Sequence, residues 1–129
     1  MGLKQRQHRR FLFNENTFLA LENGKTRVGG IKDLSKGGSS FEYFSGETSP
    51  IHGQAKLEIF IFVNKFRLSE IPCNVIYDTP INKPLGRNGY VPPFTTRICG
   101  VQFGDLTKEQ LEQLLYFLGN HNTGTATWK

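Results

Sequence analysis

Apolar and polar residues alternate over several short stretches of the chain, and this is the pattern of β-strands that bury one face. The strands are expected over residues 11–21, 26–32, 39–44, 56–63, 66–77 and 95–103. Asn23-Gly24 lies between the first two strands and is the strongest hairpin signal in the sequence. The run 56–63 is apolar on both faces, so we expect cover on both sides of it.

Three local features predict irregularities in these strands. Gly29-Gly30 weakens the second strand and indicates a bulge or a close approach of another backbone. The inward-facing positions slip by one residue between Leu68 and Ile71, and a β-bulge near Ser69-Glu70 would absorb this slip. Pro72 has no N–H to pair, so we expect a free strand edge at that point.

A single amphipathic helix is predicted after the last strand. Thr107-x-x-Gln110 is a capping box at its start, and Gly119-Asn120 marks its end. Its apolar stripe is expected to consist of Leu111, Leu114, Leu115 and Leu118. The Thr- and Asn-rich tail, residues 120–129, is expected to be disordered.

Residues 78–94 contain four prolines and are predicted to form a long loop, which is either a functional cover or a tolerated insertion. Short strands followed by one helix predict a small antiparallel β-barrel with the helix packed on it. A length of 129 residues suits one domain whose core is large enough to fold without disulfides.

Composition and charge narrow the class of protein. Eleven Phe against one Met and one Trp favour an aromatic-filled β core over a Leu- and Ala-rich helical bundle. The net charge of +5 favours an anionic partner such as a nucleotide, a nucleic acid or a lipid headgroup. No apolar run reaches the length of a membrane span, and Phe11-Leu12-Phe13 is too short for a signal-peptide core, so we expect a cytoplasmic protein.

The sequence offers no catalytic or metal-binding constellation, and we expect neither enzyme activity nor a cofactor. His8, His52 and His121 are scattered, and none has a Cys, a Ser or a carboxylate at the spacing of a triad or a metal site. Cys73 and Cys99 lie in predicted strands, where we expect buried and reduced thiols; one disulfide between them is the alternative. We interpret the chain as a binding module.

Residues 33–38, Asp33-Leu34-Ser35-Lys36-Gly37-Gly38, are predicted to form a polar turn between two strands. Asp and Ser side chains fold back onto backbone N–H groups and Gly supplies positive φ, so we expect the turn to direct a carboxylate and a hydroxyl outward together. A lone string of this kind is most often an ordinary hairpin connection. Upstream of it, Arg6 and Arg10 flank three residues in a basic arm that precedes the first acidic residue, Glu15.

This order of motifs, Arg-x-x-x-Arg, a strand, and Asp-x-Ser-x-x-Gly at the end of the next strand, resembles the PilZ domain family, whose bacterial members bind the second messenger cyclic di-GMP. The likeness continues through the strand 99–103 and Asp105-Leu106-Thr107 at the start of the helix. It implies a six-stranded antiparallel β-barrel with a C-terminal amphipathic α-helix. We expect a mobile ligand-binding arm over residues 1–10, the barrel and helix over 11–119, and the tail over 120–129.

The resemblance assigns binding roles to the arginines of the arm. Arg6 and Arg10 would clamp the phosphates or guanines of cyclic di-GMP, because a guanidinium forms bidentate hydrogen bonds and stacks on bases. Arg9 would supplement this clamp or face solvent. Many family members double the first arginine, whereas Gln5 precedes Arg6 here, and this leaves one bound nucleotide or a stacked pair open.

The resemblance also assigns roles to the turn. Asp33 would accept hydrogen bonds from the N1–H and the N2 amino group of a guanine, a pairing that discriminates guanine from adenine. Ser35 would add a hydroxyl donor or acceptor, and Gly38 would leave the backbone bare where the base approaches.

Three functions follow from these motifs as hypotheses. In the first, cyclic di-GMP bridges the arm and the barrel, so that binding orders the arm and creates a surface for a downstream protein partner. In the second, the chain is a PilZ-like adaptor that binds another protein and no nucleotide, through the barrel or the 78–94 loop. A barrel that binds single-stranded nucleic acid is the third; we expect no DNA or RNA partner, because outside the arm the basic residues are not grouped with aromatics.

Overall fold

The structure is a computed structural model, and it describes residues 11–12, 17–46, 50–61, 66–81, 95–120 and 124–125. The elements in these ranges are β1 (Phe11–Leu12), β2 (Thr17–Asn23), β3 (Lys25–Leu34), β4 (Gly38–Ser45), β5 (Gly53–Ile61), β6 (Phe66–Pro80), β7 (Thr95–Phe103), α1 (Lys108–Asn120) and β8 (Gly124–Thr125).

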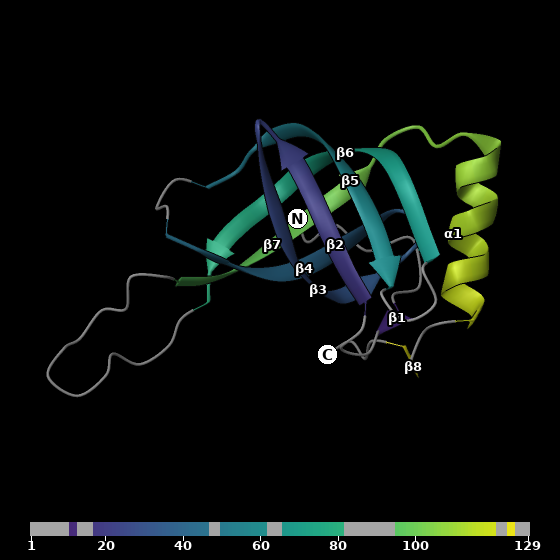
Figure 1. The fold of residues 1–129 in the computed structure, drawn as a ribbon, viewed down its shortest axis with the longest axis horizontal. Coiled ribbons are helices and arrows are strands. Elements are labelled where there is room, and N and C mark those ends of the chain that lie inside the picture. Colours follow the sequence, from purple (N-terminus) through teal and green to yellow (C-terminus); the bar gives the residue numbers. More distant parts are fainter. Residues whose placement is uncertain are drawn as a thin grey trace, which may run out of the picture.

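Six of these strands close into an antiparallel barrel, with α1 beside β6 (Figure 1). The strand order is β2-β5-β6-β7-β4-β3, and pairing of β3 with β2 completes the ring. The predicted six-stranded barrel with one C-terminal helix is therefore confirmed. Outside the ring, β1 pairs with the end of β3, and β8 pairs with β1. Gly124–Thr125 thus form a strand within the tail that we expected to be disordered.

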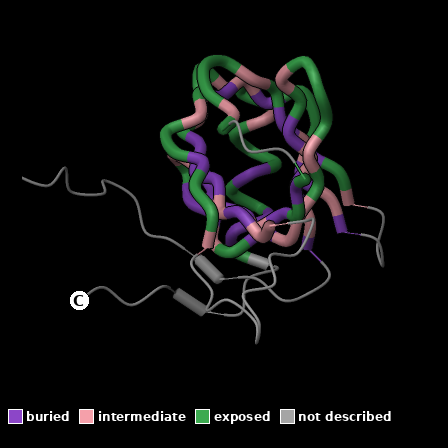
Figure 2. Tube along the Cα trace, turned by 90° about the vertical axis from the view of Figure 1, so that its left-hand side faces the viewer, coloured by how far each residue is buried: buried purple, intermediate pink, exposed green. Residues whose placement is uncertain are grey.

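The interior of the barrel holds the hydrophobic core. Figure 2 looks toward one end of the barrel and shows buried positions alternating with exposed ones along the strands. The alternation arises because successive side chains of a strand point to opposite faces. The largest fully buried barrel side chains are Phe41, Leu19, Leu21, Leu34, Leu57, Ile59, Leu68 and Ile71.

Helix α1 adds Leu114, Phe117 and Leu118 to this core, and the Phe117 ring lies 4.8 Å from the Phe66 ring of β6. The predicted apolar stripe is therefore only partly right, because Leu111 and Leu115 are exposed. The helix is rotated so that an aromatic residue, Phe117, replaces Leu115 in the packed face.

The start of α1 is capped as predicted, and the cap also ties the helix to the barrel. Thr107 and Gln110 exchange reciprocal side chain–backbone hydrogen bonds, each 3.0 Å long. The Gln110 side-chain amide also donates to the backbone carbonyls of Ser69 and Glu70. These two residues form the predicted β-bulge, where the register of β6 shifts against β5 and Glu70 adopts a φ of 60°.

Other backbone predictions have mixed outcomes. The hairpin at Asn23-Gly24 is confirmed, with Gly24 at a φ of 78°. Gly29 marks a close backbone approach, since a Cβ there would collide with the Glu42 carbonyl. The free edge expected at Pro72 is wrong, because the Gly104 N–H donates to the Pro72 carbonyl over 2.7 Å.

The outer face of β5 is covered, as its apolar pattern predicted. Phe60 stacks on Phe18 of β2, with ring centroids 5.8 Å apart. The Arg67 guanidinium lies over the Phe60 ring at 5.9 Å from its centroid. Residues 62–63 of the predicted strand lie outside the described residues.

Candidate ligand-binding site

The turn between β3 and β4 is closed by hydrogen bonds of one residue, Ser35. Its backbone N–H donates to the Gly38 carbonyl over 2.8 Å. Its Oγ accepts from the N–H groups of Gly37 and Gly38 at 3.1 and 3.2 Å. A serine hydroxyl that bonds the backbone two and three residues on is a turn-forming device. These bonds hold the connection in one shape.

The same hydrogen bonds change the prediction for the Ser35 side chain. The hydroxyl is directed at the turn's own backbone and Ser35 is buried, so the expectation that it points outward beside a carboxylate is wrong. Asp33 is partly exposed and lies on the outer face of β3, because the following Leu34 points into the core. Ser39 Oγ donates to the Asp33 backbone carbonyl over 2.8 Å and steadies this part of the strand.

Gly38 begins β4 and packs directly against β7. A Cβ at this position would collide with the Val101 carbonyl. The Phe103 N–H donates to the Gly37 carbonyl over 2.8 Å, so the turn is also tied to the end of β7. The lack of a side chain at Gly38 therefore has a cause in the barrel itself.

Strand β1, which follows the basic arm in sequence, lies beside the part of β3 that leads into this turn. Leu12 pairs with Asp33 and Phe11 with Leu34, in antiparallel register. Arg10 immediately precedes Phe11 in sequence. Arg6, Arg9 and Arg10 themselves lie outside the described residues. The structure thus joins the segment that follows the two arginines to the strand that carries the carboxylate.

A bulge in β3 lies next to this junction. The register of β3 against β4 shifts between Ile31 and Asp33, which makes Lys32 the extra residue. Its ammonium group lies 3.2 Å from a carboxylate oxygen of Glu42 on β4. A bulge re-aims the side chains of its strand, so this irregularity helps to set the direction of Asp33.

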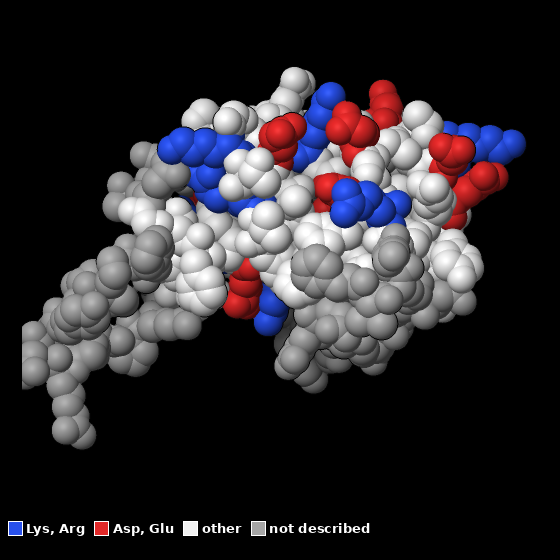
Figure 3. Space-filling model, viewed as in Figure 1, with Lys and Arg blue, Asp and Glu red and all other residues white. Residues whose placement is uncertain are grey.

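Charged side chains of both signs intermingle over the face shown in Figure 3. Among the described residues, ion pairs at the surface include Glu70 with Lys56 at 3.3 Å and Glu58 with Arg67 at 2.9 Å. Exposed pairs of this kind contribute little to stability. On this face the net positive charge is not concentrated in one patch.

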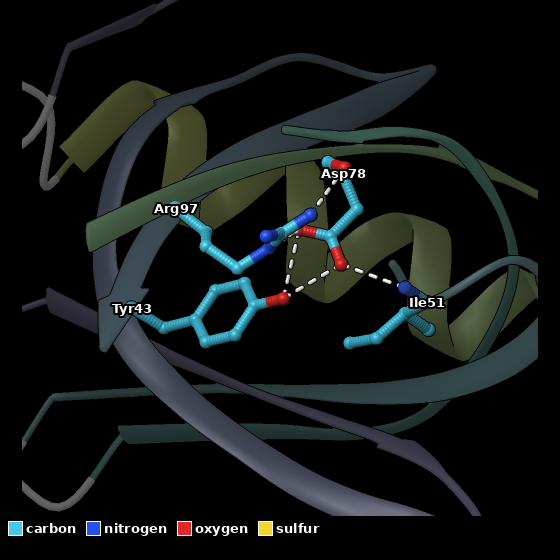
Figure 4. A network of polar contacts seen from close by, with 4 residues as sticks. All are labelled: Tyr43, Ile51, Asp78 and Arg97. Carbon is cyan, nitrogen blue, oxygen red and sulfur yellow. Dashed lines mark hydrogen bonds and ion pairs between the residues drawn. The ribbon is translucent and has the colours of Figure 1, made fainter. Parts of the chain in front are cut away.

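A second polar cluster lies inside the barrel, away from the turn (Figure 4). The Asp78 carboxylate accepts hydrogen bonds from Tyr43 Oη at 2.7 and 2.8 Å, from Arg97 Nε at 3.1 Å and from the Ile51 N–H at 2.7 Å. Arg97 Nη2 also donates to the Asp78 backbone carbonyl over 2.8 Å. The side chains of Arg97 and Asp78 are only 6% and 0% exposed. Both charges are paired, as buried charges require.

Sequence reasoning missed this cluster, although one signal for it existed. Asp78 was placed at the start of a loop because prolines follow it, whereas β6 continues to Pro80. Arg97 falls on the inward-facing positions of β7, between residues of the core. A charged residue at an inward position needs a partner of opposite charge, and this requirement pointed to a buried acid. The 82–94 part of the predicted loop lies outside the described residues.

The cluster affects the acid–base properties of its surroundings. Burial and the hydrogen bond to Asp78 raise the pKa of Tyr43 well above its usual value. Burial opposes the charge of Arg97, but the hydrogen bond and charge of Asp78 outweigh it, so the pKa of Arg97 is raised. Tyr43 therefore stays neutral and Arg97 charged at physiological pH.

Cys73 and Cys99 are free and buried, as predicted. Burial raises the pKa of Cys73 to about 11 and that of Cys99 to about 12. Both are neutral thiols near pH 7 and poor nucleophiles. In the described ranges, no group of three or more His, Cys, Asp or Glu residues is placed to hold a metal ion. Helix α1 is too short and too polar to cross a membrane, and the described part of the chain has no other candidate span.

Comparisons with known proteins give a consistent family and fold. The family model described as the PilZ domain matches residues 4–119. Among solved structures, the chain is similar to the PilZ domain with c-di-GMP of YcgR from Escherichia coli, at a TM-score of 0.69 and 14% identity over 92% of each chain. It is also similar to the MrkH–c-di-GMP complex of K. pneumonia, at a TM-score of 0.64 and 15% identity.

A third similar structure is the inhibitor of motility MotI/DgrA of Bacillus subtilis, at a TM-score of 0.56 and 14% identity. The alignments cover 92% and 90% of this chain but only 52% of MrkH and 50% of MotI/DgrA. A search of curated protein sequences found no match. At these identities the structural likeness establishes the fold.

Proposed function

This chain belongs to the PilZ family, and we propose that it is a receptor for cyclic di-GMP rather than an enzyme. The observation that carries the proposal is the pairing of Leu12 with Asp33. The segment that follows Arg-x-x-x-Arg thereby pairs with the strand that carries the Asp of Asp-x-Ser-x-x-Gly, although the two motifs are far apart in sequence, and this supports a shared site. The similar structures of YcgR and MrkH, both described with c-di-GMP, support the same ligand.

In the proposed complex, the arm and the turn divide the recognition of the ligand. Arg6 and Arg10 bind phosphate oxygens or guanine O6 and N7 through bidentate hydrogen bonds, or stack on a base, and Arg9 supplements them. Asp33 accepts hydrogen bonds from guanine N1–H and the N2 amino group. Adenine has no N1–H and no N2 amino group, so the carboxylate selects guanine.

Ser35 and Gly38 contribute to the proposed site chiefly through the shape of the turn. The hydrogen bonds of Ser35 fix the turn before any ligand arrives, and this lowers the entropy lost on binding. Gly38 lets β4 begin close to β7. Both residues of the motif then act on the ligand through the backbone that they position.

We further propose that cyclic di-GMP orders residues 1–10 and so creates a surface for a downstream protein partner. A polar arm that spans the ligand pays its ordering entropy at the moment of binding. Hydrogen exchange of the arm amides, measured with and without nucleotide, tests this switch. Equal protection in the two states would rule it out.

Calorimetric titration of the purified chain with cyclic di-GMP tests the receptor function, with GTP as the matched nucleotide control. We expect micromolar or tighter binding of cyclic di-GMP, no binding of GTP, and binding weakened by roughly tenfold or more in Arg10→Ala and Asp33→Ala variants. The stoichiometry also distinguishes one bound nucleotide from a stacked pair. Absence of heat from a folded, nucleotide-free chain would contradict the proposal.

A protein-binding adaptor is the second candidate, favoured by the outward face of α1. Leu111, Leu115 and Tyr116 are exposed there, at 37%, 43% and 60%. An apolar helix face of this kind fits a protein partner. The adaptor function predicts that Arg10→Ala leaves partner binding intact, whereas a nucleotide-dependent receptor would lose it.

A further inference from the structure

Four residues on neighbouring strands form one row on the outer face of the barrel. Asp33 pairs with Ser40, Ser40 with Gly100, and Gly100 with Tyr77. Each of the four has a buried neighbour in sequence that points into the barrel, so all four lie on the outer side of their strands. These buried neighbours are Leu34, Phe41, Cys99 and Asp78. The two end residues, Asp33 and Tyr77, are accessible there, whereas Ser40 and Gly100 between them are buried. The row runs from the carboxylate of the proposed guanine site to an aromatic ring.

The Tyr77 ring lies across Gly100. A Cβ at Gly100 would collide with Cε2 and Cζ of the ring, so the ring occupies the space that any other residue would fill with its side chain. Tyr77 nevertheless keeps 38% of its surface exposed. One side of the ring rests on β7 while part of it still faces outward.

Two features hold Tyr77 in this position. Ile76 is an extra residue in β6, inserted between the pairs Val75–Val101 and Tyr77–Gly100, and such a bulge redirects the side chains around it. The next residue, Asp78, is anchored inside the barrel by Arg97 and Tyr43. The backbone at Tyr77 is thus fixed from both sides, which preorganises the ring for contact with a ligand.

We propose that Tyr77 is a stacking platform for a guanine of cyclic di-GMP, at the far end of the row from Asp33. The inference rests on the proposed function. Three strand spacings separate the two residues, about 14 Å at about 4.8 Å per strand. Cyclic di-GMP carries guanines on either side of its sugar–phosphate ring, so one ligand or a stacked pair bridges this distance. Ser40 and Gly100 supply no large side chain between the two ends.

Alanine substitution at Tyr77 tests the platform by calorimetry with cyclic di-GMP. Stacking of a base on an aromatic ring is worth roughly 1–3 kcal/mol, so Tyr77→Ala should weaken binding by roughly 5- to 150-fold. Tyr77→Phe keeps the ring and should bind within about twofold of the wild type. Tyr116→Ala removes an exposed tyrosine from α1 and serves as the matched control with unchanged affinity.

The outcomes separate this inference from the function on which it rests. Wild-type binding together with an unchanged Tyr77→Ala affinity overturns the platform and leaves the receptor standing. A wild-type chain that gives no heat overturns both. Equal losses in Tyr77→Ala and Tyr116→Ala would show a general effect of removing a tyrosine and would also overturn the platform.

A fluorescent variant reads the stacking directly and keeps a ring at the site, so it does not depend on the fold of the alanine variant. Trp128→Phe removes the sole tryptophan, and Tyr77→Trp then introduces one at the platform. A guanine stacked on it should quench its emission in proportion to calorimetric occupancy. The control, Tyr116→Trp in the same background, should not respond. Equal emission of the platform variant with and without saturating cyclic di-GMP would overturn the proposal.

Discussion

The turn after β3 and the Asp78 cluster inside the barrel each have an aspartate of interest, Asp33 and Asp78, yet they are held together in opposite ways. The hydrogen bonds of the turn join residues two to six positions apart and mostly involve the backbone. Those of the interior cluster join side chains 19 to 35 positions apart. A local motif can be recognised in the sequence, whereas a long-range cluster forms only when the barrel brings distant residues together.

Burial explains what each aspartate is suited for. Asp33 pairs with Leu12 of β1, stays partly exposed and remains accessible to a ligand. Asp78 is fully covered and its hydrogen-bonding capacity is used by the chain itself. We therefore expect substitutions of the interior aspartate to act on stability and those of the outer aspartate to act on binding.

The largest expected effect is that of Asp78→Ala on stability. The change leaves the Arg97 guanidinium buried without its carboxylate, and loss of one partner of a buried pair costs about 3–5 kcal/mol. Urea unfolding measures the loss, with Asp105→Ala, an exposed carboxylate, as the control. Equal free energies of unfolding in the two variants would contradict a structural role for the cluster.

Asp33→Ala should separate binding from stability. Removing an acceptor of charged hydrogen bonds costs about 1.5–3 kcal/mol, so we expect cyclic di-GMP affinity to fall by roughly tenfold or more. Thermal unfolding without ligand should match the wild type within about 1 kcal/mol, as for most surface substitutions. If Asp33→Ala bound cyclic di-GMP normally but unfolded at a lower temperature than the wild type, the binding role assigned to Asp33 would be contradicted.

Gly38→Ala tests whether the turn's last glycine serves the barrel. The added methyl would collide with the Val101 carbonyl, and forced overpacking costs about 1–3 kcal/mol. Gly30→Ala is the matched control, because a Cβ there meets nothing within 4 Å. We expect lower urea midpoints for the first variant alone; equal midpoints would place the requirement for glycine at the ligand instead.

Alkaline pH should destabilise the interior through Cys73 and Cys99. Their pKa values are raised in the folded state to about 11 and about 12, from 9.0, so the folded state holds these protons more tightly. The resulting stability is complete below pH 9 and is lost as pH rises through the folded pKa values. By pH 10 the expected loss is about 1 kcal/mol per thiol.

Thermal unfolding between pH 8 and pH 10 measures this loss. The double variant Cys73→Ala, Cys99→Ala should show a weaker pH dependence of stability. Tyr43 contributes to the dependence that remains, because its pKa is raised too. The same slope in wild type and double variant would exclude the thiols as its source.

Local patterns predicted most of the barrel. The hairpin at Asn23-Gly24, the bulge at Ser69-Glu70 and the cap of α1 depend on neighbouring residues, and the sequence displays them. The buried face of α1 was less predictable. Leu111 and Leu115 fit the helical spacing of an apolar stripe just as the buried residues do, yet they are exposed. Contacts with the barrel decide which side packs, among them that between Phe117 and Phe66.

The candidate site was predictable as a motif but not as a geometry. The sequence could not reveal that the Ser35 hydroxyl turns inward, since the same residue types fit either direction. The alternation through Ile71, Cys73 and Val75 would carry Tyr77 to the core, but the extra residue at Ile76 turns it outward. Unlike the bulge at Ser69-Glu70, the one at Ile76 is followed by no run of alternating apolar residues in β6 that would show the slip, so the outer row stayed hidden.

The sharing of β3 between two partners has a consequence for experiments that shorten the chain. Lys25–Gly30 pair with β2, but Asp33 and Leu34 have β1 as their neighbour on that side. Deleting the arm together with β1 would bare unpaired backbone N–H and C=O groups at the motif, and such an edge invites pairing with another molecule. Self-association of a truncated chain would then imitate ligand-driven assembly. Point substitutions in the arm keep this edge covered.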